Sequence, residues 1–142
     1  MEIDRYIEQA ESILLNGGTF DDERKIFIRN LETCDLLAVP GSGKTTALLA
    51  KLYCIAQNMP FEDGSGILVL AHTNNAVDEI EKKLKKHCPQ LFEYPNFVGT
   101  IQGFINRFLT IPLYNQKNSN KFKIIEYEDY IKEFDYHLAH TK

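Results

Sequence analysis

A glycine-rich turn between an apolar run and a helix-forming segment constrains this chain more than any other feature. It reads AVPGSGKT from Ala38 to Thr45 and fits the pattern G-x-x-x-x-G-K-[ST], except that Ala38 replaces the first glycine. The run Leu36–Val39 before it is predicted to be a strand buried on both faces. Residues 44–57 are predicted to be a helix that neighbouring elements largely cover. Strand, turn and helix in this order indicate a phosphate-binding loop.

The residue types of the turn suit a triphosphate. Gly41 and Gly43 let the backbone curl so that its N–H groups face phosphate oxygens, and the positive end of the helix dipole faces the same anion. Lys44 is predicted to reach the β- and γ-phosphates, and the Thr45 hydroxyl to ligate Mg²⁺, which makes these two the predicted catalytic residues. The alternative is a strand–helix turn without a ligand. The predicted site for ATP and Mg²⁺ comprises Pro40, Gly41, Ser42, Gly43, Lys44, Thr45 and Thr46.

The strand–helix cycle repeats downstream of the turn. Residues 67–71 and 96–99 are predicted to be strands, the first of them buried, and residues 75–87 and 100–109 to be helices. This alternation predicts an α/β fold, a parallel sheet flanked by helices. Four lysines at 82, 83, 85 and 86 are predicted to form a solvated helix face.

The two ends of the chain carry further predicted elements. Residues 2–15 have the apolar spacing of an amphipathic helix, and Thr19 or Asp21 is predicted to cap a second helix. Residues 115–120 are polar and predicted to be a loop, and residues 128–137 a helix.

Composition limits the class of protein. A chain of 142 residues with 44% hydrophobic and 25% charged residues is the size of one globular domain. Its apolar runs are far shorter than the roughly 20 residues that cross a bilayer, and its N-terminus lacks a signal-peptide pattern, so a cytoplasmic location without a membrane partner is predicted. The net charge of −4 does not by itself support nucleic-acid binding. Three cysteines without a CxxC motif are predicted to be free thiols.

Three segments occur in an order that resembles a known family. They are LLAVPGSGKTTALLAKL, ILVLAHTNNAVDEIEKKL and VGTIQGFINRFL. Together they resemble motifs I, Ia and Ib in the first RecA-like domain of superfamily 1 DNA helicases of the UvrD/Rep type, over roughly residues 20–110. The resemblance implies a RecA-like P-loop NTPase fold, and ATP hydrolysis coupled to translocation on single-stranded DNA.

The second and third segments carry the DNA contacts that the resemblance implies. The family pattern Thr-Phe-Thr-Asn-x-Ala-Ala stands here as AHTNNAV, with a histidine where a base-stacking phenylalanine is usual; histidine can also stack. Capping of the next helix is the alternative role for the Thr and Asn residues, and both roles can hold together. The pattern Gly-Thr-Phe-His-Ser-Phe stands as GTIQGF, in which Phe104, with Phe108, is predicted to be a core residue. The implied DNA-binding residues are His72, Thr73, Asn74, Asn75, Thr100, Gln102 and Gly103.

A further motif lies upstream in such helicases, Leu-Asn-x-x-Gln, whose glutamine reads the adenine. The corresponding stretch here is FDDER, so Arg24 takes the place of the glutamine and is implied to contact the nucleotide. An arginine can stack on a base but cannot accept a hydrogen bond, which leaves adenine specificity open.

Several parts of a complete helicase motor are not found in the sequence. Asp78-Glu79 lies inside a predicted helix and Glu126 is out of register, so neither provides the acidic pair that follows a strand in a Walker B motif. We therefore predict that residues 1–112 are the N-terminal part of the ATP-binding domain, and that residues 113–142 begin an inserted helical subdomain or connecting region. The missing C-terminal helicase domains are expected partners, and the chain alone is expected to bind ATP without hydrolysing it efficiently. The alternatives are a non-catalytic nucleotide-binding module acting with a partner subunit, and another P-loop enzyme such as a small-molecule kinase.

Overall fold

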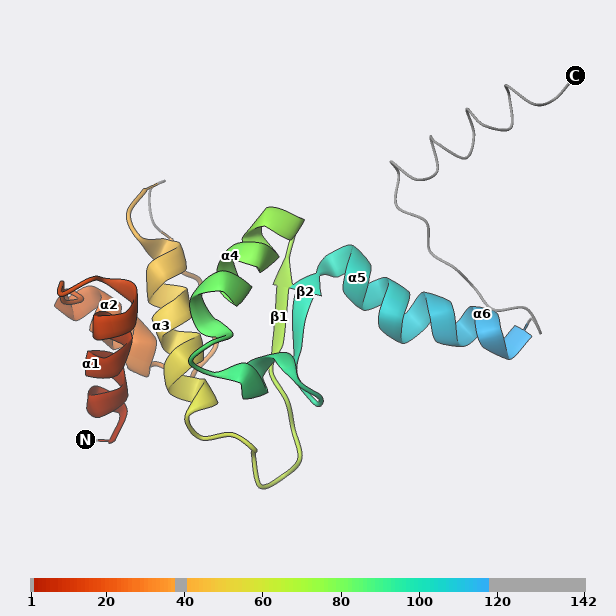
Figure 1. Ribbon diagram of the computed structural model, residues 1–142, viewed down its shortest axis with the longest axis horizontal. Helices are drawn as coiled ribbons and strands as arrows, with labels where there is room; N and C mark the ends of the chain where they lie inside the picture. Colours follow the sequence, from red (N-terminus) through yellow and green to blue (C-terminus); the bar gives the residue numbers. More distant parts are fainter. Residues whose placement is uncertain (1, 38–40, 118–142) are drawn as a thin grey trace, which may run out of the picture. The chain divides into compact units, whose positions relative to one another are not determined.

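The computed structural model describes residues 2–37 and 41–117, and the chain divides into two compact units, Met1–Ile101 and Gln102–Lys142 (Figure 1). The predicted boundary after residue 112 stays a prediction. No helix among the described residues is both long and apolar enough to span a membrane. The elements of the first unit are α1 (Glu2–Leu14), α2 (Asp22–Arg29), α3 (Lys44–Ala56), β1 (Leu68–Ala71), α4 (Asn74–Leu84), η1 (Pro89–Phe92) and β2 (Phe97–Thr100).

The two N-terminal helices form where the sequence predicts them. Asn16 and Gly17, which follow α1 after Leu15, have positive φ of 49° and 95°, and the chain leaves the helix there. Of the two predicted caps for α2, the structure uses Asp21, whose carboxylate accepts a hydrogen bond from the Arg24 N–H at 2.9 Å.

The sheet of the first unit is parallel, as predicted. β1 and β2 pair in a register that runs from Leu68 opposite Phe97 to Ala71 opposite Thr100. The connection between them contains α4, which makes a β-α-β unit. Figure 1 shows α3 and α4 on the same side of these strands.

Helix α3 occupies the centre of the core. Seven of its thirteen residues are buried, which confirms the prediction that neighbours cover it. Val69 and Val98, from adjacent strands, pack against this core. Cys54 and Cys88 are buried free thiols, and burial raises the pKa of each to about 11. Cys34 is an exposed free thiol, so the prediction of free cysteines is confirmed.

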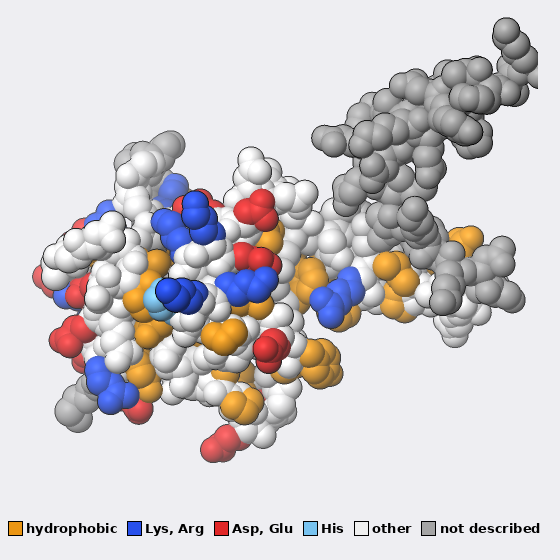
Figure 2. Space-filling view, in the orientation of Figure 1, with side chains coloured by type: hydrophobic (Ala, Val, Ile, Leu, Met, Phe, Trp, Pro, Cys, Tyr) orange, Lys and Arg blue, Asp and Glu red, His pale blue; other side chains and the backbone are white. Residues whose placement is uncertain are grey.

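Acidic and basic side chains lie side by side over α4 (Figure 2). Lys83 and Lys85 form ion pairs with Glu79 and Glu81, four residues earlier, at 3.5 and 3.0 Å. Such exposed pairs contribute only a few tenths of a kcal/mol each. This arrangement agrees with the predicted solvated face.

The predicted strand before the glycine-rich turn is wrong where the structure describes it. Leu36 and Leu37 are not in a strand and are 40% and 93% exposed; residues 38–40 lie outside the described residues. A strand depends on neighbours that pair with its backbone, and the described sheet contains β1 and β2 alone. The prediction that the strand at residues 67–71 is buried is also wrong, because Leu68 and Leu70 in β1 are 51% and 43% exposed.

The described part of the second unit is helical from Gln102 to Lys117. It comprises most of α5 (Ile101–Ile105), the π-helical segment η2 (Asn106–Thr110) and α6 (Ile111–Lys117). Residues 115–117 were predicted to be loop and are helical instead; residues 118–120 and the helix predicted at 128–137 lie outside the described residues. Pro112 has no backbone N–H to donate to the preceding turn, and proline usually ends a helix. Here the wider π-helical turn lies directly before α6, and the helix continues past Pro112.

Phe104 and Phe108 are not core residues in the described structure. Their ring centroids are 4.9 Å apart, and Phe108 is 42% exposed. Neither α5 nor η2 contains a buried residue. The two rings therefore cover each other, and the prediction of a core role is corrected.

Candidate nucleotide-binding site

The glycine-rich turn has the backbone conformation that its sequence predicts. Gly41 and Gly43 have φ of 80° and 81°, in the left-handed region that favours glycine. α3 begins at the next residue, Lys44, and Gly43 is its N-cap without a side-chain hydrogen bond. An α-helix leaves its first N–H groups without partners inside the helix, so the first turn of α3 is suited to donate to an anion. Pro40, predicted to join the site, lies outside the described residues.

Ser42 adds a second sign that the turn receives a polar ligand. Its hydroxyl oxygen is buried and has no hydrogen-bond partner among the described residues. Buried hydroxyls are normally paired, and an unpaired one calls for an explanation. A phosphate oxygen would supply the missing partner, so the turn fits a phosphate group.

Two cavities adjoin the turn. One of about 240 Å³ is lined by Gly41, Ser42, Gly43 and Thr46, and also by Leu15, Thr19, Phe20 and Arg24. The other, of about 190 Å³, is lined by Ser42 and the half-buried Lys44, with the acidic residues Asp21 and Glu23 on its wall. Thr45, the predicted Mg²⁺ ligand, is exposed. The structure thus brings Ser42 to Thr46 to one place, and their contacts with a nucleotide stay predictions.

Arg24 lies against the turn and lines both cavities. Its guanidinium group bonds to the Asp21 carboxylate and donates to the Ser42 carbonyl oxygen. The site that a Cβ atom would occupy at Gly43 is 3.7 Å from the Arg24 Nε and Nη2 atoms. The structure therefore places Arg24 on the backbone of the loop, and its contact with a base stays a prediction.

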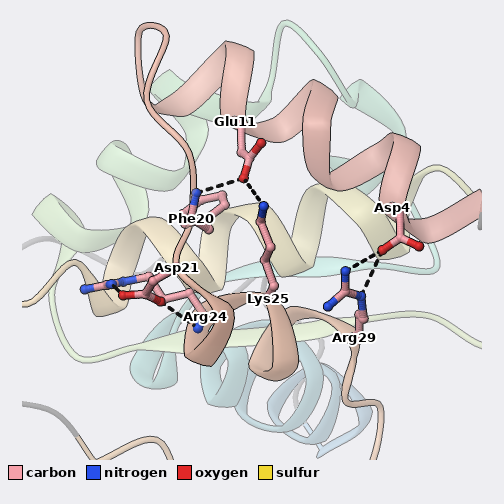
Figure 3. A network of polar contacts seen from close by, with 7 residues as sticks. All are labelled: Asp4, Glu11, Phe20, Asp21, Arg24, Lys25 and Arg29. Atoms are coloured by element: carbon pink, nitrogen blue, oxygen red, sulfur yellow. Dashed lines mark hydrogen bonds and ion pairs between the residues drawn. The ribbon is translucent and has the colours of Figure 1, made fainter.

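Glu11 is a residue of this region that the sequence interpretation missed. Its side chain is buried, and one carboxylate oxygen accepts the Phe20 N–H at 2.8 Å and lies 3.3 Å from the Lys25 ammonium nitrogen (Figure 3). Its spacing in the sequence could have indicated this burial. Glu11 follows the buried Ile7 by four residues on α1, so both residues lie on the apolar side of the helix.

The loop after β1 has a different arrangement. The Thr73 hydroxyl accepts a hydrogen bond from the Ala76 N–H at 3.3 Å and caps α4, which confirms the capping role. His72, Asn74 and Asn75 are exposed. DNA contacts by these four residues stay predictions.

The segment after β2 contains the other predicted DNA contacts. Thr100 is the last residue of β2 and pairs with Ala71 at the end of β1, so the loop after β1 starts beside it. In the second unit, the Gln102 amide donates to the Asn106 side-chain oxygen at 3.0 Å, and Gly103 lies within α5. Their DNA contacts also stay predictions.

Comparison with known proteins identifies the family. A sequence model of the UvrD/REP helicase N-terminal domain matches residues 21–142. The matched segment begins at the cap of α2 and contains the glycine-rich turn and both strands. A search of curated proteins found no match. The chain therefore belongs to the UvrD/REP helicase family and matches the N-terminal domain of its members.

Proposed function

We propose that this chain is the ATP-binding part of an ATP-dependent DNA helicase, which couples ATP hydrolysis to translocation on single-stranded DNA. The observation that carries the proposal is the turn Gly41–Gly43, which leads into the N-terminal end of α3 and carries a buried hydroxyl without a hydrogen-bond partner among the described residues. Membership of the UvrD/REP family supports the helicase activity.

Each residue of the turn has a separate proposed task. The N–H groups of residues 41–46 and the Ser42 hydroxyl hold phosphate oxygens, Lys44 neutralises the β- and γ-phosphates, and Thr45 ligates Mg²⁺. Bound Mg-ATP supplies the phosphoanhydride bond whose hydrolysis drives movement. Arg24 holds the loop from outside through the Ser42 carbonyl oxygen. Pro40 and Thr46 complete the proposed site.

Single-stranded DNA is the proposed polymer ligand. His72 would stack on a base, and Asn74 and Asn75 would reach the strand beside Thr73. The exposure of these side chains and the neighbouring ends of β1 and β2 support this arrangement. Thr100, Gln102 and Gly103 are proposed to contact the DNA backbone.

Hydrolysis requires more than the described residues provide. Neither β1 nor β2 is followed by an Asp-Glu pair, and Asp78 and Glu79 lie within α4. This observation favours a second candidate for the isolated chain, a nucleotide-binding module that needs the remaining helicase domains or another subunit for catalysis. Both candidates share the same ATP site.

A fluorescence-anisotropy titration tests the helicase proposal. The chain is added to a labelled single-stranded oligonucleotide with and without Mg-ATP, and phosphate release is measured in parallel. We expect DNA binding that His72→Ala weakens about fivefold or more, because stacking contributes roughly 1–3 kcal/mol per base, together with slow phosphate release. Absence of DNA binding would overturn the helicase assignment, and rapid DNA-stimulated turnover would overturn the need for further domains.

A further inference from the structure

A cavity of about 460 Å³ lies in front of the two strands of the first unit. One wall comes from residues 59–65, which precede β1, and the other from residues 90–96, which precede β2. Because β1 and β2 are parallel, both walls lie at the same edge of the sheet, and the proposed DNA-binding loops follow the opposite edge (Figure 1). Helix α3 begins at the phosphate loop and ends three residues before Met59, and its thirteen residues span about 20 Å. The cavity is therefore separate from the candidate nucleotide site.

Apolar side chains form most of the two walls. Phe61 and Met59 are half-buried, whereas Tyr94 is 88% exposed. Pro60 and Pro95 lie beside them in the same walls. Grooves lined by aromatic rings are typical docking sites for proline-containing peptides, which are already extended before they bind.

Hydrogen bonds hold the two walls together in the free protein. The Asn96 side-chain oxygen accepts the Ile67 N–H at 2.8 Å, and the Asn96 amide nitrogen donates to the Gln90 carbonyl oxygen at 2.8 Å. The Gln90 side chain donates in turn to the last carbonyl oxygen of α3, at 3.1 Å. A Cβ atom at Gly66 would lie 2.6 Å from the Pro95 carbonyl oxygen, so the backbones of the two segments approach closely there. The cavity is thus preformed, which lowers the entropic cost of binding.

The rim of the cavity is acidic. Glu93 lines it, and Glu62 and Asp63 belong to the other wall; all three are exposed. Hydrogen bonds from the Ser65 hydroxyl and N–H lower the pKa of Asp63 and so favour its charged form. Neither wall contains a lysine or arginine, and none of the three carboxylates forms an ion pair within the described part of the chain. In the view of Figure 2, hydrophobic and acidic side chains lie over the segment before β1, without a basic one. The rim therefore favours a cation and repels the phosphates of a nucleic acid.

We propose that this cavity is a docking site for a partner protein, which inserts an extended, proline-containing segment that carries an arginine or lysine. The proline rings pack against the apolar walls, and the cation lies over the exposed Tyr94 ring beside Glu93. Because the cavity is at the opposite edge of the sheet from the proposed DNA-binding loops, the partner and DNA can be bound together.

Nitrogen–proton correlation spectra of the labelled chain, titrated with three synthetic peptides, test the proposal. The peptide GRPLPPRPG carries both features, GEPLPPEPG reverses the charge, and GRALAARAG removes the prolines. We expect the first peptide to shift the amide resonances of residues 59–66 and 90–97 and to bind at least about fivefold more tightly than either control. Absence of binding by the first peptide, equal binding of all three, or shifts confined to other residues would overturn the proposal.

Variants at the rim make the test specific to this cavity. Tyr94→Ala, at an exposed position, should weaken the first peptide about fivefold, whereas Tyr94→Phe keeps the ring and should bind like wild type. Glu93→Gln should weaken it about threefold, and Glu8→Gln, an exposed position on α1 outside the cavity, should have no effect. Mg-ATP affinity should be unchanged in all four variants. Wild-type peptide affinity in Tyr94→Ala, or shifts at residues 90–97 caused by a single-stranded oligonucleotide, would contradict the proposed occupant.

Discussion

Two helices of the first unit begin after a turn, and their N-terminal ends differ. The Thr73 side chain caps α4 by accepting the Ala76 N–H at 3.3 Å. Gly43 is the N-cap of α3 and has no side chain that could accept a hydrogen bond from that end. Both ends carry the same dipole and the same kind of first-turn N–H groups.

The difference between the two ends assigns them different roles. A threonine cap and a bound anion compete for the same N–H groups, and in α4 the Ala76 N–H is already satisfied by the Thr73 side chain. The end of α3 can receive phosphate oxygens. We therefore expect the loop before α4 to bind its ligand through exposed side chains, such as His72 and Asn74.

The largest expected effect is that of Lys44→Ala. It removes the charge next to the proposed phosphates while Gly41 and Gly43 keep their conformation. We expect Mg-ATP affinity measured by calorimetry to fall at least about 100-fold, roughly 3 kcal/mol. The circular dichroism spectrum should not change. Unchanged affinity in a folded variant would show that the α3 end is not the nucleotide site.

Gly43→Ala should disturb the N-terminal end of α3 through the backbone. A Cβ atom would lie 3.7 Å from Arg24, which is ordinary contact, but φ of 81° is strained for alanine. The expected loss in free energy of unfolding is about 1–2 kcal/mol, measured by urea denaturation, with weaker Mg-ATP binding. Gly41→Ala, with φ of 80° and an open Cβ position, should behave alike. If both variants kept the wild-type free energy of unfolding, the left-handed conformation of Gly41 and Gly43 would be contradicted.

Thr73→Ala should act on stability alone. Loss of the cap should lower the free energy of unfolding by about 1 kcal/mol. Thr73→Ser keeps the hydroxyl and serves as the control. Mg-ATP affinity should stay at the wild-type value in both. A change in nucleotide affinity would mean that the two helix ends are not independent.

Ser42→Ala should show the smallest effect on stability. Its hydroxyl has no partner among the described residues, so its removal should leave stability unchanged or slightly higher. If the hydroxyl binds a phosphate oxygen, Mg-ATP affinity should fall by about tenfold, as expected for one hydrogen bond to a charged group, roughly 1.5 kcal/mol. A drop in stability with unchanged affinity would place its partner within the protein.

The helices of the first unit could be predicted from sequence because their signals are local. Apolar spacing set the extent of α1, and Asp21 and Thr73 are caps whose hydrogen bonds reach only three residues ahead. The left-handed glycines at 41 and 43 likewise follow from the turn that they form.

The errors arose where structure depends on distant partners. The run at residues 36–39 has strand composition, but Leu36 and Leu37 do not pair with the described sheet. Glu11 was missed because its partners, Phe20 and Lys25, belong to the next segment of chain. Composition cannot show which donors a buried carboxylate will meet.

A nitrogen–proton correlation spectrum of the labelled chain, recorded during titration with Mg-ATP, tests the contrast between the two helix ends most directly. The amide resonances of residues 41–46 should shift as ATP is added, because these N–H groups gain phosphate acceptors. Those of residues 73–77 should stay in place, because the Thr73 cap persists. Shifts confined to residues 73–77, or no shifts at residues 41–46 at saturating nucleotide, would contradict the account.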